Sequence, residues 1–549
     1  MKTTKTTTTP LNRLRRRATG AVALLAAIAL AAGCSTSSAS GNASASSSSE
    51  SDTTWTTISS SVATASTGAS VSDILGANAS VEDASSSADD AGTPDTSSAT
   101  TITLSGSSAS ASGSASSNVK VDGGTVTISG GGTYVISGEL SNGRIVVKAP
   151  KADVRLVLSG ASITSSDGPA IDIQDAGNAI VVLAKDSKNT LTDGASYASG
   201  QEATAALFSS DTLTLTGTGS LTVTGAHEDG ISSKNGLAVT GSPTITVNAA
   251  DDGLRGKDWL LIDGGTLTVT AGGDGLKSSE DDDETKGFVA LGGATVSVTA
   301  GDDGVTATTD VTVEGTNLTI AAGGGQAGAT VQTQPGPDQT DSASSSDDTT
   351  AKPKGIAAGV SYTQDSGTVR IDAADEGVQA AFINVGGGVL TVDSGDDAIN
   401  ASNGDHTIEG YESADSESDD GSVLTISGGQ VQLDYAGSDG IDSNGSAFVT
   451  GGQVLIGGQA GAMDGAVDAN GESTLVGVTG SPGVAEGDTV TVTSADGTSR
   501  QLTSTVSADY TTVLGLTEGT QYTVSTTSGG SATNTASALS SGMGGGPGQ

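Results

Sequence analysis

A motif of an acidic residue, a glycine and an apolar residue returns along this chain and constrains its fold more than any other feature. The clear copies are Asp229-Gly230-Ile231, Asp252-Gly253-Leu254, Asp274-Gly275-Leu276 and Asp303-Gly304-Val305. Weaker copies follow at Glu376-Gly377-Val378, Asp397-Ala398-Ile399 and Asp439-Gly440-Ile441. A period of about 20 to 30 residues is typical of a solenoid, whose repeats pack only against their neighbours.

Each period also holds two short stretches in which apolar and polar residues alternate around a pair of glycines. In one period Leu260 and Ile262 alternate before Gly264-Gly265, and Leu267 and Val269 alternate after it. Alternation at period two predicts strands with one face inward, so we expect an all-β fold in which each repeat is one coil of a parallel β-helix. Only 4 Phe, 2 Trp and 7 Tyr occur, which predicts a narrow core of Val, Ile, Leu and Ala.

Changes in composition divide the chain into five segments. Residues from Ser35 to Asn118 are rich in Ser, Ala and Thr and contain no Lys or Arg, so we expect them to be disordered. The predicted segments are a lipoprotein signal peptide at 1–33, a disordered stalk at 34–118, the β-helix at 119–480 with flexible inserts at 323–350 and 409–420, a C-terminal β cap or small β unit at 481–530, and a flexible Gly-rich tail at 531–549.

The N-terminus predicts export. Arg15, Arg16 and Arg17 precede an apolar run that ends at Gly33-Cys34, the only cysteine of the chain. This spacing resembles the bacterial lipobox, so we expect a secreted protein held at the bacterial cell surface by a lipid on Cys34. An ordinary signal peptide and twin-arginine export remain as alternatives.

The charge of the chain limits its partners. It carries 63 acidic and 22 basic residues, a net charge of −41. Such a chain is repelled by nucleic acid and by anionic membrane surfaces, so we expect neither as a partner except for the membrane reached through the lipid anchor. Multivalent cations are the natural counterpart.

The repeated aspartates have two explanations. Any single Asp-Gly pair can be turn chemistry, in which Asp caps the turn and Gly supplies a positive φ. In a stack, however, equivalent carboxylates lie about 4.8 Å apart and repel by about 1 kcal/mol in water. Calcium (Ca2+) bound by oxygen ligands between repeats would remove this repulsion. The predicted ligands are Asp229, Asp251, Asp252, Asp274, Asp302 and Asp303. The acidic stretch from Glu280 to Glu284 is either a looser site or a solvated loop.

Several strings in the chain resemble one bacterial family. They are Thr133-Tyr134-Val135-Ile136-Ser137-Gly138, Asp229-Gly230-Ile231-Ser232-Ser233-Lys234, Ala250-Asp251-Asp252-Gly253-Leu254-Arg255-Gly256-Lys257-Asp258 and Gly272-Gly273-Asp274-Gly275-Leu276-Lys277-Ser278. The chain resembles the bacterial cell-surface carbohydrate-binding proteins. The resemblance implies a right-handed parallel β-helix, calcium, and binding of polysaccharides such as cellulose or polygalacturonate.

We therefore expect a monomeric, calcium-dependent polysaccharide-binding protein without enzymatic activity. Candidate sugar-binding residues are Lys234, Arg255, Lys257, Trp259 and Lys277. Trp259 should point outward, because Leu260 and Ile262 point inward, and it is the candidate for stacking on a sugar. Two alternatives remain: a calcium-dependent polyuronate lyase that uses one of these basic residues as its base, and a surface stalk or adhesin scaffold that binds nothing.

Overall fold

The computed structural model describes residues 57–59, 71, 87–329, 352–404, 406–414, 418–458 and 465–539. Strands dominate these residues, so the predicted all-β class is confirmed. The described helical elements are short: α4 (Ser87–Asp90) and the 3-10 turns η1 (Ser116–Asn118) and η2 (Gln326–Gly328). In this described part, no helix is long and apolar enough to cross a bilayer. The predicted signal peptide and Cys34 lie outside it.

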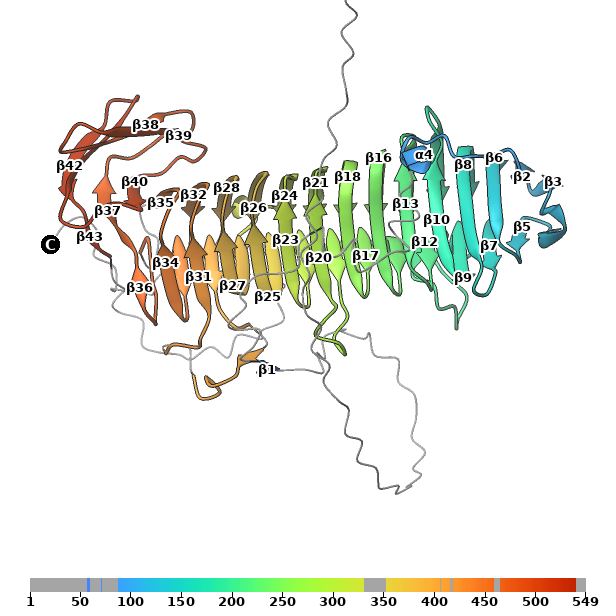
Figure 1. The fold of residues 1–549 in the computed structure, drawn as a ribbon, viewed down its shortest axis with the longest axis horizontal. Coiled ribbons are helices and arrows are strands. Elements are labelled where there is room, and N and C mark those ends of the chain that lie inside the picture. Colours follow the sequence, from blue (N-terminus) through green and yellow to red (C-terminus); the bar gives the residue numbers. More distant parts are fainter. Residues whose placement is uncertain are drawn as a thin grey trace, which may run out of the picture. The chain divides into compact units, whose positions relative to one another are not determined.

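Most strands pair in parallel with a strand one repeat further along the chain, and the pairings form three rows (Figure 1). The first row follows β6 (Gly132–Leu140) and consists of β8 (Asp153–Thr164), β10 (Asn178–Leu183), β13 (Leu213–Gly217), the first halves of β16 (Gly236–Ala249) and β18 (Trp259–Ala271), β20 (Phe288–Gly292), β23 (Asp310–Glu314), the second halves of β25 (Ile356–Gln364) and β27 (Val378–Val385), β31 (Val423–Ile426), β34 (Ser446–Val449) and β36 (Ser473–Thr474).

We call the second row the threonine row. It consists of the second half of β8, β11 (Lys188–Thr192), β14 (Ser220–Gly225), the second halves of β16 and β18, β21 (Thr295–Ala300), β24 (Asn317–Ala322), β26 (Thr368–Ala373), β28 (Val389–Ser394), β32 (Gln430–Tyr435) and β35 (Gln453–Gly458).

The third, short row consists of β5 (Thr125–Ile128), β7 (Arg144–Lys148), β9 (Ile171–Asp175), β12 (Ala205–Ser209), β15 (Asp229–Ser233), β17 (Leu254–Gly256), β19 (Leu276–Ser278), β22 (Val305–Ala307), the first halves of β25 and β27, β29 (Ile399–Ala401) and β33 (Ile441–Ser443).

The core follows directly from the alternation in the sequence. In the second half of β18, Leu267 and Val269 are buried, while Thr266, Thr268 and Thr270, which alternate with them, are exposed. The register places Leu267 beside Ile245 of β16 and Val296 of β21. Repetition of this contact produces one continuous column of Val, Ile, Leu and Ala.

The predicted disordered stalk at 34–118 is wrong for its last part. Strand β2 (Thr100–Gly106) pairs in parallel with β6 and antiparallel with β3 (Ser108–Gly113). Its residues Ile102 and Leu104 are buried at the start of the core column. The segment was judged by its average composition, which is rich in Ser, Ala and Thr, although it contains one strand with alternating apolar residues. This strand is sufficient to cover the open end of the stack. Next, β4 (Val119–Asp122) forms a hairpin with β5.

The C-terminal residues form a second core. Strands β38 (Thr489–Ser494), β39 (Ser499–Thr503), β41 (Gln521–Thr526) and β42 (Ser531–Thr535) build an antiparallel sheet. Strand β40 (Tyr510–Leu514) pairs antiparallel with β35 and with β37 (Val476–Ser481), and β37 also pairs with β43 (Ser537–Ala538). The segment is thus both a cover for the threonine row and a sheet with its own core. The predicted tail cannot begin at 531, because β42 and β43 belong to this unit.

The predicted inserts are ordered where they are described. The first begins with η2, where the Gln326 backbone N–H donates to Asp372 Oδ1 at 2.6 Å. In the second, Tyr411 packs close to Gly421, and Asp420 is buried. A further short strand, β30 (Thr407–Ile408), pairs in parallel with β1 (Thr57–Ile58).

Candidate functional site

The four clear acidic motifs lie at equivalent positions of four successive repeats. Their apolar residues are paired in register along β15, β17, β19 and β22. Asp229, Asp252, Asp274 and Asp303 therefore stack at the turn between the threonine row and the short row, and we call them the aspartate ladder. The predicted stacking is present in the structure.

Three of the four ladder carboxylates bind the backbone of the next repeat, whereas Asp229 Oδ2 accepts the Thr204 hydroxyl at 3.1 Å. Asp252 Oδ1 accepts the Asp274 N–H at 3.0 Å, Asp274 Oδ1 accepts the Asp303 N–H at 3.0 Å, and Asp303 Oδ1 accepts the Lys354 N–H at 2.8 Å. These bonds satisfy buried amides that would otherwise be costly. The aspartates thus cap turns, and they do so between repeats rather than within one turn.

The glycine of the motif has a different role from the predicted one. None of Gly230, Gly253, Gly275 and Gly304 has a positive φ. Instead, a Cβ at Gly275 would lie 2.1 Å from Val298 Cγ1 and 2.6 Å from the Gly304 carbonyl oxygen. Glycine is required because the turn packs directly onto the core valine of the following repeat.

Lys277 neutralises the middle of the ladder. Its Nζ lies 3.1 Å from Asp252 Oδ2 and 3.0 Å from Asp274 Oδ2. Burial opposes the lysine charge, but the carboxylates of Asp274 and Asp252 raise the pKa of Lys277. An ammonium group thus occupies the place between two repeats where we expected a cation to bridge.

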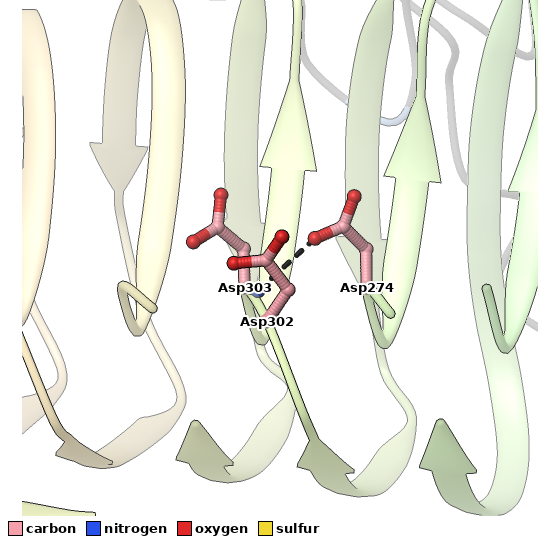
Figure 2. Close-up of side chains that lie close together, drawn as sticks. All are labelled: Asp274, Asp302 and Asp303. Atoms are coloured by element: carbon pink, nitrogen blue, oxygen red, sulfur yellow. Dashed lines mark hydrogen bonds between the residues drawn. The ribbon is translucent and has the colours of Figure 1, made fainter. Parts of the chain in front are cut away.

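The carboxyl groups at the two ends of the ladder hold protons more tightly than an ordinary aspartate does. Burial, reinforced by Asp252, raises the pKa of Asp229 to about 7. Burial, reinforced by Asp274, raises the pKa of Asp303 to about 8. Carboxylate oxygens of Asp274, Asp302 and Asp303 all lie within 4.8 Å of one another (Figure 2). These are hard oxygen donors, the type of ligand that calcium accepts. Asp229 and Asp251 join no such group of three among the described residues.

The acidic stretch after Lys277 forms a second group. Oxygens of Glu280, Asp281 and Asp282 also lie within 4.8 Å of one another. Glu280 already pairs with Lys257 at 3.5 Å and accepts the Asp282 N–H at 2.9 Å. Both predicted interpretations of this loop therefore remain.

The predicted basic residues lie together along the short row, and all of them have polar partners. Besides the contacts of Lys277 and Lys257, Lys234 pairs with Glu202, and Arg255 Nε donates to Ser279 Oγ at 3.2 Å. Lys234, Arg255, Lys257 and Lys277 form what we call the basic patch.

Trp259 is not available to stack on a sugar. It points away from the core column, as predicted, but only 6% of it is exposed. It packs with Val71, Ala238, Leu261 and Ala290 on the outer side of the first row. A Cβ at Gly236 would lie 1.9 Å from the indole, so the ring also covers this glycine. Its cover includes Val71, about 190 residues earlier, which local alternation could not reveal.

The threonines that were predicted on the outer face of the strands form a continuous surface, to which we assigned no function from the sequence. Five adjacent strands of the threonine row present short polar side chains that are exposed or half-exposed, and we call this surface the threonine face. Its members are Thr222, Thr224, Thr244, Thr246, Asn248, Thr266, Thr268, Thr270, Thr295, Ser297, Thr299, Asn317 and Thr319. The exposed Asp251 and Asp302 lie at its border, at the ladder turn.

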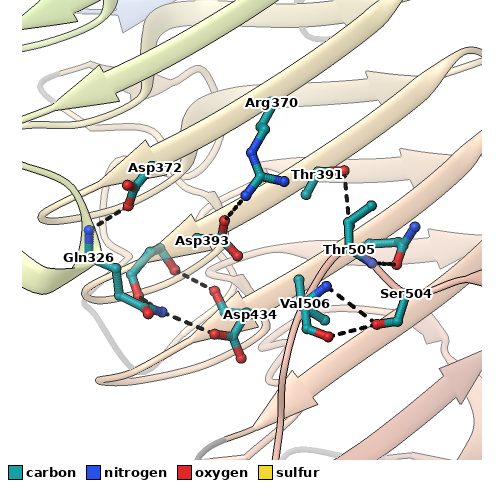
Figure 3. Close-up of polar contacts among 11 residues, drawn as sticks. Gln326, Arg370, Asp372, Thr391, Asp393, Asp434, Ser504, Thr505 and Val506 are labelled. Atoms are coloured by element: carbon teal, nitrogen blue, oxygen red, sulfur yellow. Dashed lines mark hydrogen bonds and ion pairs between the residues drawn. The ribbon is translucent and has the colours of Figure 1, made fainter. Parts of the chain in front are cut away.

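Beyond β24 the outer face of the row changes: β26 carries Arg370, and from β28 onward the row contacts the C-terminal unit (Figure 3). Arg370, the register partner of Thr319, pairs with Asp393 at 3.0 Å. Thr391 lies 3.3 Å from Thr505, and the Gln432 side chain bonds the backbone of Thr503 and Thr505 at 2.9 Å. The threonine face therefore ends at β24, and after one more strand the C-terminal unit begins to contact the row at β28.

Residues 122–398 match the family described as carbohydrate-binding domain-containing protein. A carbohydrate-binding domain-containing protein of Acetivibrio thermocellus is 35% identical over 129 residues, which are 23% of this chain and 45% of that protein. The match thus spans less than half of the relative. A solved structure of a polysaccharide lyase-like protein from C. thermocellum, a gadolinium derivative, is 30% identical and covers 41% of this chain and 92% of its own, with a TM-score of 0.40. Because the family match covers just over half of the 549 residues, the chain belongs to the family of carbohydrate-binding domain-containing proteins.

Proposed function

We propose that this protein binds polysaccharide across the threonine face and its acidic border, on a right-handed parallel β-helix. The parallel register at intervals of one repeat supports this fold. The observation that carries the function is the regular, exposed array on five adjacent strands. Strands lie about 4.8 Å apart and alternate residues about 6.6 Å apart, so hydroxyl groups repeat in two directions and suit an ordered glycan surface.

Calcium dependence belongs to the acidic border in this proposal. An acidic glycan such as a polyuronate would be repelled by Asp302 and Asp303, whereas calcium held by these residues and Asp274 would attract it. A neutral glucan such as cellulose would need only the hydroxyl groups of the face. The basic patch would contact glycan carboxylates near the ladder.

Binding to insoluble cellulose and to polygalacturonate, each with calcium and with chelator, tests this function. Thr246→Arg with Thr268→Arg should abolish cellulose binding, and Asp302→Asn with Asp303→Asn should abolish calcium-dependent polygalacturonate binding. Thr535→Arg, on the exposed C-terminal sheet, is the matched control. Undiminished binding by both double variants would place the site elsewhere, and no binding by the wild type would favour a scaffold.

Incubation of the protein with polygalacturonate also tests the lyase alternative, because a lyase would release unsaturated products. A base must be neutral, but the carboxylates around Lys277 keep it charged despite its burial. Lys277 is therefore unsuited to act as a base, and ultraviolet absorbance from released unsaturated uronides would reveal a lyase that uses another basic residue.

We also propose that the mature protein is a monomer anchored at the bacterial surface by a lipid on Cys34. The lipobox-like spacing around this cysteine supports the anchor. Cys34→Ala should move the protein from the membrane fraction to the medium. Unchanged fractionation of this variant would contradict the anchor.

A further inference from the structure

The outer column of the short row changes its charge along the stack. Upstream it contains Arg255 and Lys277, which are register partners. Downstream the register places Asn400 beside Asp442. The bridge between Ile441 and Val467 then places Asp468 beside Asp442. Three successive repeats thus present only an amide and two carboxylates, and we call these residues the downstream triad.

Two oxygens of this triad are buried without a hydrogen-bond partner among the described residues: Asn400 Oδ1 and Asp468 Oδ1. Asn400 is only 8% exposed. Its Nδ2 donates to Glu376 Oε1 of the preceding repeat at 3.0 Å. The amide nitrogen thus points to the preceding repeat, while the register partner of Asn400 in the following repeat is Asp442. A buried acceptor without a donor is costly and requires an explanation.

The charges around the triad are not neutralised by basic side chains. At the ladder position three repeats upstream of Asp442, Lys354 pairs with Asp375 at 2.7 Å and with Glu376 at 3.2 Å. Across the described residues, by contrast, no Lys or Arg forms an ion pair with Asp442 or Asp468. Burial, followed by the charges of Asp468, Glu376 and Asp420, raises the pKa of Asp442 to about 7.

We propose that Asn400, Asp442 and Asp468 bind a calcium ion between successive repeats, at a site separate from Asp274, Asp302 and Asp303. All three side chains offer hard oxygen ligands, which calcium accepts at about 2.3 to 2.6 Å, and repeats about 4.8 Å apart allow one ion to reach ligands on both sides. A calcium ion at this place would be a positively charged partner for Asn400 Oδ1 and Asp468 Oδ1, which accept no hydrogen bond among the described residues. This site does not depend on which glycan the protein binds.

Calorimetric titration of the full chain with calcium alone tests the site. Asp442→Asn with Asp468→Asn should weaken one class of calcium site at least about tenfold, because two charged ligands are lost. The matched control, Asp302→Asn with Asp303→Asn, should leave that class unchanged. If calcium binding by the Asp442/Asp468 variant equals that of the wild type, the proposal is wrong. Cellulose and polygalacturonate binding play no part in this readout.

Thermal unfolding in chelator shows that the comparison is made on folded protein. Removing two unneutralised charges should leave the variant at least as stable as the wild type without calcium. If this variant unfolds instead, Asn400→Asp decides the question. This variant supplies a third carboxylate, so its calcium affinity should rise several-fold while its stability in chelator falls. Unchanged or weaker calcium binding by Asn400→Asp would overturn the proposal.

Discussion

Lys277 is a single residue that neutralises two stacked carboxylates of the aspartate ladder. Side chains of Asp252 and Asp274 are only 3% and 10% exposed, and the ammonium group lies within about 3 Å of both. Breaking a buried pair leaves an uncompensated charge, which costs more than the pair itself contributes. Lys277 thus neutralises the middle of the ladder, whereas among the ion pairs of the described residues none joins a lysine to Asp303 at its downstream end.

Lys277→Met should therefore destabilise the protein by about 2 to 3 kcal/mol at pH 7, because two buried carboxylates lose their counter-ion. Urea unfolding in chelator measures this loss. Lys188→Met, at an exposed position of β11, is the control and should change stability by less than about 0.5 kcal/mol. Equal stability of the wild type and Lys277→Met would show that the ladder does not need the ammonium group.

Asp393 gives a pH dependence with a definite sign. Burial raises its pKa from 3.8 to about 6, although Arg370 opposes the shift. The folded state thus holds a proton that the unfolded state loses near pH 4, so this stabilising contribution is complete below pH 4 and is lost as pH rises through 6. Asp393→Asn should match the wild type near pH 4 and be more stable by about 1 to 2 kcal/mol at pH 8. Denaturant unfolding across this range measures the difference, and a constant difference at all pH values would contradict the assignment.

At the scale of the element, the turn is fixed by the valine or isoleucine that its glycine contacts. The weaker motif at Gly377 has the same geometry, since a Cβ there would lie 2.1 Å from Val392 Cγ1. The repeat is therefore maintained by packing between a turn and the next strand of the threonine row. Turn conformation alone would not require glycine at a negative φ.

Gly275→Ala should cost about 2 to 3 kcal/mol through overpacking against Val298. Val298→Ala in the same chain should recover part of this loss, which a double-mutant cycle in urea would detect. Gly386→Ala is the control, because that glycine is exposed and the nearest atom to its Cβ would be Asp365 Oδ1 at 3.3 Å. If Gly275→Ala and Gly386→Ala cost the same, the contact with the valine is not the constraint.

Strands were predictable from the sequence because alternation such as Leu267-Thr268-Val269 encodes both a strand and its buried face. The stacking of Asp252 on Asp274 followed from the repeat length. Contacts between distant segments were not predictable: β2 covers the end of the stack, and Val71 covers Trp259. The partner of each carboxylate was equally hidden, since Lys277 could have turned toward solvent.

At the scale of the whole molecule, the net negative charge repels all the repeats from one another. The chain has a net charge of −41 and a pI near 4.1. Most basic residues near the ladder are already paired with carboxylates, so the excess is negative. Self-repulsion of this kind destabilises the compact state and is screened by salt, whose Debye length falls from about 30 Å at 0.01 M to about 10 Å at 0.1 M.

Sodium chloride should therefore raise the melting temperature at pH 8, measured in chelator so that calcium sites do not contribute. Near pH 4 the net charge approaches zero, so the excess repulsion disappears and salt mainly screens the ion pairs that remain. The salt effect should then vanish or reverse. Sodium sulfate is unsuitable because it also strengthens apolar burial. An equal rise in melting temperature at both pH values would mean that salt acts on something other than the excess negative charge.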